Sequence, residues 1–210
     1  ERIVDLKRRL ADCFAPYDHV YDPLLDEFEP GMKTADVRRI FGQLRDPLVT
    51  LIRSAAARPP VDDSFLRRGF DEAAQWAFAS EVVGELGYDW SRGRQDRTVH
   101  PFSISLGFDD VRITTRVAAD YFPTCLFGSV HEAGHAMYEQ GFDRSLARSP
   151  LADGASLGVH ESQSRMWENL VARSLPFWEH FYPRLRARFP GVLDDVGLEA
   201  FHRGINRVSP

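Results

Sequence analysis

The sequence has only two cysteines among its 210 residues, and it has no long apolar run. Cys13 and Cys125 are far apart and lack the spacing of a metal-binding or redox pair, which argues against a disulfide framework. No run approaches the roughly 18 apolar residues of a membrane-spanning helix, and the charged start ERIVDLKRRL does not resemble a signal peptide. We therefore expect a soluble, cytoplasmic protein with no membrane partner.

Concentrated basic charge is also missing. The 26 Lys and Arg residues are interspersed with 31 Asp and Glu residues, and the net charge is −5. Because proteins that bind nucleic acid usually carry a basic patch, we expect no nucleic-acid partner. The hydrophobic content of 43% is enough to bury a core, so the sequence predicts a folded globular protein.

Helical patterns fill the first 90 residues, which we expect to form a helical scaffold. Asp62 or Asp63 is expected to cap the last of these helices, and Gly87 to end it. Apolar residues recur at helical spacing in three segments, residues 3–14, 34–52 and 62–86.

A small sheet is expected next, after a polar turn at residues 91–97. The segments 100–106 and 111–117 alternate apolar or β-branched residues with polar ones on either side of a Gly/Asp turn. This pattern predicts two antiparallel strands. Strand alternation places Arg112 and Arg116 on one face of the second strand.

The residues His131-Glu-Ala-Gly-His135 have the pattern of a zinc site with its catalytic base. Residues four apart on a helix share a face, so His131 and His135 can direct ring nitrogens at one cation. Glu132 lies roughly 100° round the same turn, where a carboxylate can take a proton from metal-bound water. The alternative is two histidines on an ordinary helix face, since so short a pattern also arises by chance.

A site with two histidines needs a third protein ligand and an open position for water, and a glutamate from a following helix is one solution. The helix expected at residues 156–174 offers Glu161. His160 and Glu168 compete with it, because His160 would make a three-histidine site and Glu168 lies two helical turns beyond Glu161.

Four motifs in fixed order resemble the M32 family of metallocarboxypeptidases, also called carboxypeptidase Taq. The resemblance is strongest over about residues 93–208. The motifs are HPF at 100–102, DVRIT at 110–114, HEAGH at 131–135 and HESQSR at 160–165. The resemblance implies a mainly helical, groove-containing fold of the HExxH-plus-Glu (gluzincin-like) type, with a small antiparallel sheet beside the metal-binding helix. It also implies a homodimer and one divalent metal per chain, zinc or cobalt.

By the same resemblance, His131, His135 and Glu161 are the metal ligands and Glu132 is the general base. The first two motifs are expected to close one end of the substrate groove.

The expected substrate is a peptide with a free C-terminal carboxylate. A planar guanidinium can bind a carboxylate through two hydrogen bonds, so Arg112 is the first candidate for this role and Arg116 the second. His100, in the HPF motif, is expected to line the same substrate site.

We therefore expect a metal-dependent carboxypeptidase that removes single residues by attack of a metal-activated water. One alternative is an endopeptidase, which shares the zinc chemistry but has a groove open at both ends. Another is a non-catalytic helical module pinned by a metal, although structural zinc usually has four protein ligands, often cysteines, and no cysteine is in position here.

Members of the family are more than twice as long as this chain, so we expect it to be a piece of a longer protein. Residues 91–210 would then form one catalytic domain cut short at its C-terminus. Alone, it should be at least about a hundredfold less active than the full chain, since ligand orientation depends on surrounding partners. The helices after Leu175 are expected to expose apolar faces.

Overall fold

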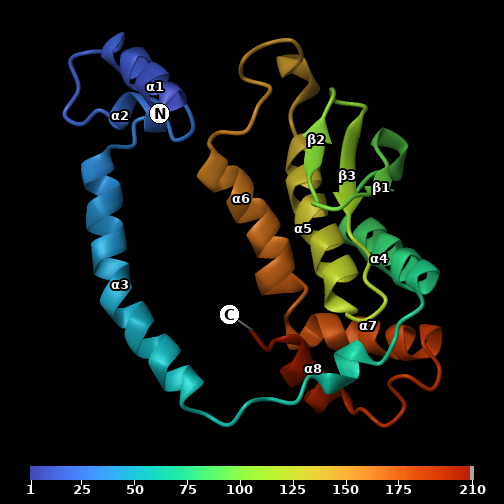
Figure 1. Ribbon diagram of the computed structural model, residues 1–210. Helices are drawn as coiled ribbons and strands as arrows, with labels where there is room; N and C mark the ends of the chain where they lie inside the picture. Colours follow the sequence, from blue (N-terminus) through green and yellow to red (C-terminus); the bar gives the residue numbers. More distant parts are fainter. Residues whose placement is uncertain (209–210) are drawn as a thin grey trace. The chain divides into compact units, whose positions relative to one another are not determined.

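The computed structural model describes residues 1–208, and this part of the chain is mainly helical, as predicted (Figure 1). The α-helices are α1 (Arg2–Asp12), α2 (Asp22–Asp26), α3 (Thr34–Ala56), α4 (Glu72–Leu86), α5 (Pro123–Gln140), α6 (Leu157–Arg165), α7 (Leu175–Arg188) and α8 (Leu198–Ile205). The strands are β1 (Gln95–Arg97), β2 (Ser103–Ser105) and β3 (Val111–Thr115). Short 3-10 turns are η1 (Ser64–Arg67), η2 (Trp90–Arg92) and η3 (Arg144–Leu146), and η4 (Met166–Val171) is π-helical.

The described residues form two compact units. The first contains Glu1–Pro60 together with the short segment Ser156–Gly158, and the second contains the rest of the described chain. The division at residue 90 expected from the sequence separates a scaffold from a catalytic part, and it stays a prediction. Within residues 1–208, no helix is long and apolar enough to cross a membrane.

The first unit consists of α1, α2 and α3. The buried carboxylate of Asp22 accepts hydrogen bonds from the backbone N–H groups of Thr34 (2.8 Å) and His19 (3.2 Å), and so ties α2 to the start of α3. Along α3, large apolar side chains stay exposed, among them Phe41 and Leu51 at 65% each. The exposed apolar surface of the first unit thus lies along α3.

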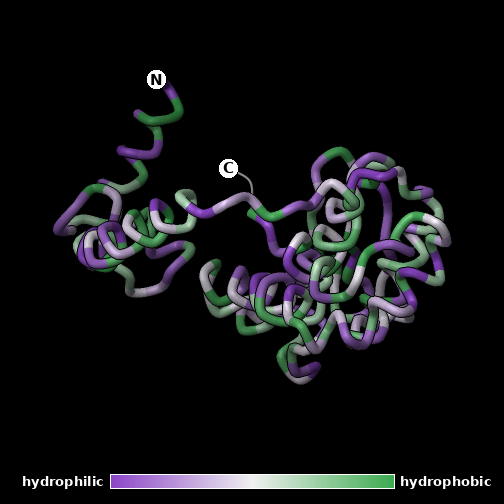
Figure 2. The backbone as a smooth tube through the Cα atoms, turned by 90° about the horizontal axis from the view of Figure 1, so that it is seen from below, coloured by the Kyte–Doolittle hydropathy of each residue, from purple (hydrophilic) through white to green (hydrophobic). Residues whose placement is uncertain are grey.

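The second unit buries its apolar residues around α5, which packs against α4, β3 and η4. The helices after Leu175 belong to this core, because Trp178 and Phe181 of α7 are 0% and 4% exposed. The expectation that they expose apolar faces was wrong, since α4 and α8 cover α7. Figure 2 shows hydrophobic and hydrophilic residues interleaved along the helices, the pattern of elements that bury one face.

The sequence predicted the residue that ends α4 correctly, but not the residue that caps its start. Gly87 ends α4 in the left-handed conformation (φ 116°), as predicted. The N-cap is Asp71, whose carboxylate accepts the Ala74 N–H at 2.8 Å, and not Asp62 or Asp63. The expected helix starts later because Asp62 binds the Ser64 N–H (2.9 Å) and begins the separate turn η1.

The sheet has the order β1-β3-β2 and is mixed. β2 and β3 pair antiparallel with Ser103 opposite Ile113, which confirms the predicted hairpin. β1 pairs parallel with β3, so the antiparallel sheet expected from the sequence acquires a third, parallel strand. The sequence Gln95-Asp-Arg97 has no apolar alternation, and it is a strand because its backbone hydrogen-bonds along β3.

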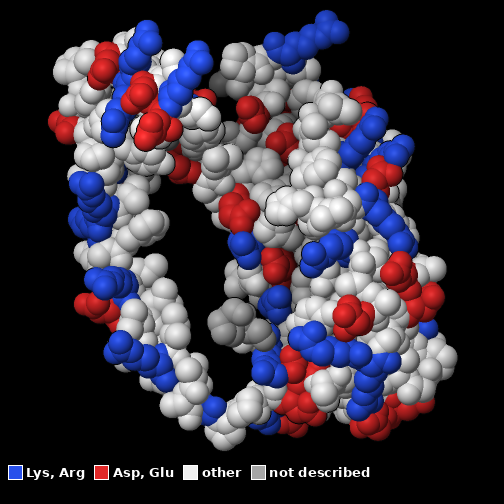
Figure 3. All heavy atoms as spheres, in the orientation of Figure 1, with Lys and Arg blue, Asp and Glu red and all other residues white. Residues whose placement is uncertain are grey.

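The two faces of β3 differ as predicted. Val111, Ile113 and Thr115 are fully buried, and the Thr115 hydroxyl donates to the Cys125 carbonyl of α5 at 3.2 Å. Arg112 lies on the opposite face, because successive side chains alternate. Arg116, expected on the same face, is exposed and follows the end of β3 at Thr115, so strand alternation does not place it. On the surface shown in Figure 3, basic and acidic side chains are interspersed without a large field of one sign.

Candidate metal centre

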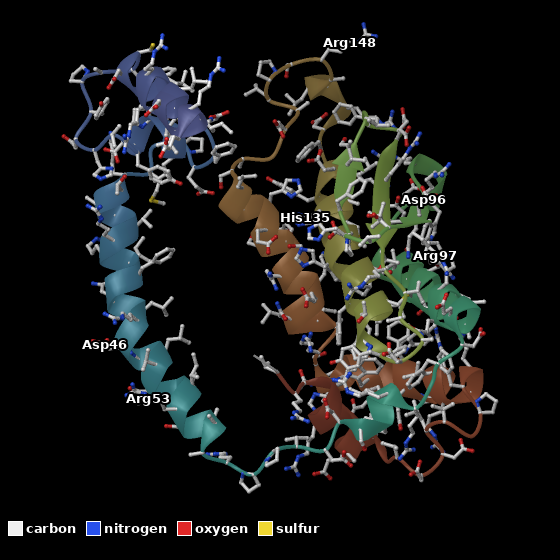
Figure 4. The ribbon with its side chains drawn as sticks, in the orientation of Figure 1. Asp46, Arg53, Asp96, Arg97, His135 and Arg148 are labelled. Carbon is white, nitrogen blue, oxygen red and sulfur yellow. The ribbon has the colours of Figure 1, made fainter. Side chains whose placement is uncertain are left out.

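His131 and His135 lie one turn apart on α5, on the side that faces α6. Their ring centroids are 5.0 Å apart, and both side chains are largely buried, with 20% and 17% exposed. Figure 4 shows His135 between α5 and α6. The predicted shared face of the two histidines is therefore present.

Glu161 of α6 faces both histidines. Its Oε2 atom lies 3.3 Å from His135 Nε2 and 3.6 Å from His131 Nε2. Donor atoms about 2.0–2.1 Å from a tetrahedral zinc are about 3.3–3.4 Å from one another, so these separations fit an ion bound between them. Within residues 1–208, His131, His135 and Glu161 form the group of three that can hold a metal, with ligand atoms within 4.8 Å of one another.

Both carboxylate oxygens of Glu161 also accept hydrogen bonds from side chains of α6. Arg165, one turn later on α6, donates from Nε to Glu161 Oε1 at 2.7 Å, and the Ser164 hydroxyl lies 3.0 Å from Oε2. Partial burial works against ionisation of Glu161, but these hydrogen bonds lower its pKa overall. The carboxylate is thus kept charged and oriented, with Oε2 toward the histidines.

Glu168 contacts the other side of the His131 ring. It belongs to η4, and its Oε2 atom lies 2.9 Å from His131 Nδ1. Burial alone would raise the pKa of Glu168, but the hydrogen bond from His131 and the charge of Arg173 lower it overall. Arg173 is in turn stacked on the Phe127 ring at 3.8 Å. Glu168 therefore orients His131 through the nitrogen that points away from Glu161.

His160, the other competitor, lies behind His135. Its Nδ1 atom is 2.6 Å from His135 Nδ1, the nitrogen that does not face Glu161. Of the three candidates that the sequence left open, Glu161 is the one whose side chain meets both Nε2 atoms. The helix phase alone could not separate them, because the choice depends on how α6 and η4 pack on α5.

Glu132 is buried beside the histidines, with 7% exposed. No hydrogen bond from a described residue reaches its carboxylate. Burial, followed by the charges of Glu161 and Glu168, raises its pKa to about 7, although His131 opposes this effect. Glu132 is thus a buried carboxyl group next to His131 in the chain, and no residue of the described part of the chain donates a hydrogen bond to it.

The pKa values of the two histidines are shifted in opposite directions. Burial and the neighbouring rings of His160 and His131 lower the pKa of His135 to about 4, so this imidazole is neutral at pH 7. The hydrogen bond to Glu168 raises the pKa of His131. A neutral imidazole is the form that binds a metal.

The residues expected to bind substrate lie on or near the sheet. Arg112 is on the face of β3 opposite α5, and Asp110 accepts two hydrogen bonds from its guanidinium, both 2.7 Å long. Arg116 is exposed and makes no ion pair with any residue of the described chain. His100 is exposed in the loop between β1 and β2.

Sequence analysis missed Glu139, whose Oε1 atom lies 2.8 Å from His160 Nε2. The available signal was spacing, since Glu139 follows His135 by the same four residues that separate His135 from His131. These three residues form one stripe along α5.

Comparison with known proteins agrees with this geometry. Residues 1–210 match the profile of the family described as Carboxypeptidase Taq (M32) metallopeptidase. The chain is 49% identical over 198 residues to thermostable carboxypeptidase 1 of Thermus thermophilus, covering 93% of this chain and 38% of that protein. It is 38% identical over 212 residues to carboxypeptidase 1 of Bacillus subtilis, covering 100% of this chain and 42% of that protein.

Solved structures give the same picture. The M32 carboxypeptidase of Deinococcus radiodurans R1 superposes with a TM-score of 0.96 at 43% identity, over 99% of this chain and 42% of that one. Metallocarboxypeptidase 1 of Trypanosoma cruzi gives a TM-score of 0.85 at 32% identity, over 100% of this chain and 42% of that one. The chain thus spans about two fifths of the length of the relatives it matches.

Proposed function

Because this chain belongs to the carboxypeptidase Taq (M32) metallopeptidase family, we propose that the protein is a metal-dependent carboxypeptidase. It removes single residues from the C-terminus of peptides, and residues 91–210 form part of its catalytic domain. The observation that carries this proposal is the convergence of Glu161 Oε2 on the Nε2 atoms of His131 and His135, at 3.6 and 3.3 Å.

One divalent ion, zinc or cobalt, would be held by His131, His135 and Glu161. The donor set fits, since two imidazoles and one carboxylate are a known three-ligand set of catalytic zinc sites. Such an ion supplies a water of lowered pKa and polarises the carbonyl under attack. The contacts of Arg165 and Glu168 support this assignment, because they orient a carboxylate and an imidazole that would otherwise rotate.

Glu132 acts as the general base. It takes the proton of the attacking water and passes it to the nitrogen of the departing residue, which leaves as an amine. This role is supported by its burial and by the lack of hydrogen-bond partners among the described residues. Burial raises the pKa of Glu132, which favours its taking up a proton.

We assign recognition of the substrate carboxylate to Arg112 first and Arg116 second, with His100 lining the same site. Arg112 offers a planar guanidinium, but a substrate must compete with Asp110 for it. Arg116 has no such competitor in the described chain. In the full-length protein, recognition of the free carboxylate would confine cleavage to the C-terminus.

The proposal extends to a homodimer in the cytoplasm. The homodimer follows from the family resemblance. The free thiols of Cys13, which is exposed, and Cys125 support a reducing compartment.

Digestion of an unrelated peptide by the full-length protein, followed by mass analysis of the products, tests the proposal. The expected result is a ladder of successive C-terminal losses that stops after chelator treatment and returns with zinc or cobalt. The same peptide with an amidated C-terminus is the control and should be cut poorly. Internal cuts would indicate an endopeptidase, and metal binding without any cleavage would indicate a non-catalytic metal site.

A further inference from the structure

The imidazole of His160 is hydrogen-bonded at both of its nitrogens. Nδ1 lies 2.6 Å from Nδ1 of His135, and Nε2 lies 2.8 Å from Oε1 of Glu139. All three side chains are mostly buried, with 22%, 17% and 15% exposed for His160, His135 and Glu139. Within residues 1–208, Glu139 makes no hydrogen bond to His131 or His135, so it reaches the metal centre through His160.

The proton positions along this chain follow from the chemistry of its last member. A carboxylate only accepts hydrogen bonds, so His160 must donate from Nε2 to Glu139. In the form with a single N–H, that proton is on Nε2 and Nδ1 of His160 is the acceptor. His135 must then donate from its own Nδ1, which leaves Nε2 unprotonated. That Nε2 is the atom 3.3 Å from Glu161 Oε2.

Packing holds the His160 ring in the orientation that this chain needs. The Tyr138 ring meets it edge to face at a centroid distance of 5.3 Å. The His135 ring lies tilted against it by 36°, at a centroid distance of 4.7 Å. A Cβ on Gly154 would lie 2.9 Å from His160 Cδ2, so only glycine leaves room for the ring there. His160 is thus fixed from both sides as well as at both nitrogens.

We propose that Glu139 is a positioning residue for the metal centre, which fixes the tautomer and orientation of His135 through His160. The inference rests on the proposed function only in taking His131, His135 and Glu161 as metal ligands. The two histidines are then oriented in different ways. The carboxylate of Glu168 contacts His131 directly, whereas the carboxylate of Glu139 acts on His135 through His160.

The test uses the metal-free full-length protein and three variants. Glu139→Leu removes the acceptor, Glu139→Gln keeps an acceptor oxygen, and His160→Phe keeps a ring but removes both nitrogens. Glu179→Leu, at an exposed glutamate of α7, is the matched control. Zinc affinity is measured by competition with a chromophoric chelator, and the visible absorption spectrum of the cobalt-loaded protein reports ligand geometry.

Glu139→Leu and His160→Phe should weaken zinc binding roughly 10–100-fold, the usual cost of losing a partner that orients a ligand. Glu139→Gln should retain most of the affinity, and the control all of it. The cobalt absorption bands should shift in Glu139→Leu, which a simple loss of stability would not cause. The melting temperature of the metal-free variants verifies that each is folded.

Three outcomes would overturn the inference: wild-type affinity and spectrum in Glu139→Leu, an equal loss in Glu139→Gln, or no metal binding by the wild type. The proposed function has a separate readout. A wild type that binds metal, responds to Glu139→Leu and yet cleaves no peptide refutes the carboxypeptidase assignment and leaves the role of Glu139 standing. If the enzyme is active and Glu139→Leu changes neither zinc affinity nor the cobalt spectrum, the role of Glu139 is refuted and the carboxypeptidase assignment stands.

Discussion

Gly134 of α5 and Ser164 of α6 are in backbone contact. A Cβ on Gly134 would lie 2.6 Å from Ser164 Cα and 3.0 Å from the carbonyl oxygen of Gln163. Glycine inside a helix costs about 1 kcal/mol relative to alanine, so its presence in the middle of α5 is otherwise unfavourable. The close approach explains it, because α6 carries Glu161 to the histidines only if it can touch α5 at this position.

The first prediction is that Gly134→Ala damages the metal centre. The added methyl group must push the backbone of α6 away from α5, which should lower zinc affinity at least about tenfold and stability by about 1–3 kcal/mol. Gly42→Ala on α3 is the matched control, since a Cβ there meets nothing within 4 Å. That control should gain up to about 1 kcal/mol. Zinc competition and denaturant unfolding measure both effects, and unchanged affinity in Gly134→Ala would remove this explanation.

The second prediction separates a ligand from a residue that orients one. Glu161→Ala should nearly abolish binding of zinc or cobalt, because one of the three proposed protein ligands is lost. Glu168→Ala should weaken binding only about 10–100-fold, because His131 loses orientation but keeps Nε2. Elemental analysis after reloading of the chelator-treated protein gives the comparison. A larger loss of metal binding in Glu168→Ala than in Glu161→Ala would make Glu168 the ligand and Glu161 the orienting residue.

The third prediction concerns Glu132. Glu132→Gln is nearly isosteric but cannot accept the proton of water, so turnover should fall about 10²–10⁴-fold. Metal content should stay at the wild-type level, because Glu132 is not among the three converging ligands. Steady-state rates and elemental analysis of the same sample measure the two properties. Wild-type turnover in this variant would rule out the role as base.

The fourth prediction addresses Arg112. Arg112→Ala should reduce hydrolysis of free-acid peptides more than cleavage of C-terminally amidated ones, since only the free acid offers a bidentate partner. Asp110→Asn is the companion variant, because it weakens the competing ion pair and should lower KM for free-acid peptides. Equal losses on both substrates in Arg112→Ala would make the residue structural. The same pair of substrates then applies to Arg116→Ala.

The fifth prediction is a pH dependence of stability. Burial raises the pKa of Tyr88 from 10.0 to about 12, and its hydroxyl donates to the Val111 carbonyl at 2.6 Å. A raised pKa favours the protonated folded state, so this stabilisation is complete below pH 10 and is lost between pH 10 and about 12. Over this range the wild type should lose about 2–3 kcal/mol more unfolding free energy than Tyr88→Phe. Parallel curves from denaturant unfolding would contradict the prediction.

Local patterns in the sequence predicted the parts of the site that lie within one element. The four-residue spacing of His131 and His135 set their shared helix face, and alternation along β3 set Arg112 opposite the buried Val111 and Ile113. The strand β1 escaped prediction, because its three polar residues pair through their backbone alone.

The sequence by itself determined the α5 motif, the hairpin of β2 and β3, and the short list of glutamates and histidines that follow the motif. Only the tertiary structure decided among them, placing Glu161 at the Nε2 atoms, and Glu168 and His160 at the Nδ1 atoms. The physical reason is that periodicity acts between residues close in the sequence, whereas these contacts join different helices. Helix and strand periodicity fixes which neighbours share a face, whereas contacts between α5 and α6 depend on how closely two backbones pack, which no local pattern specifies.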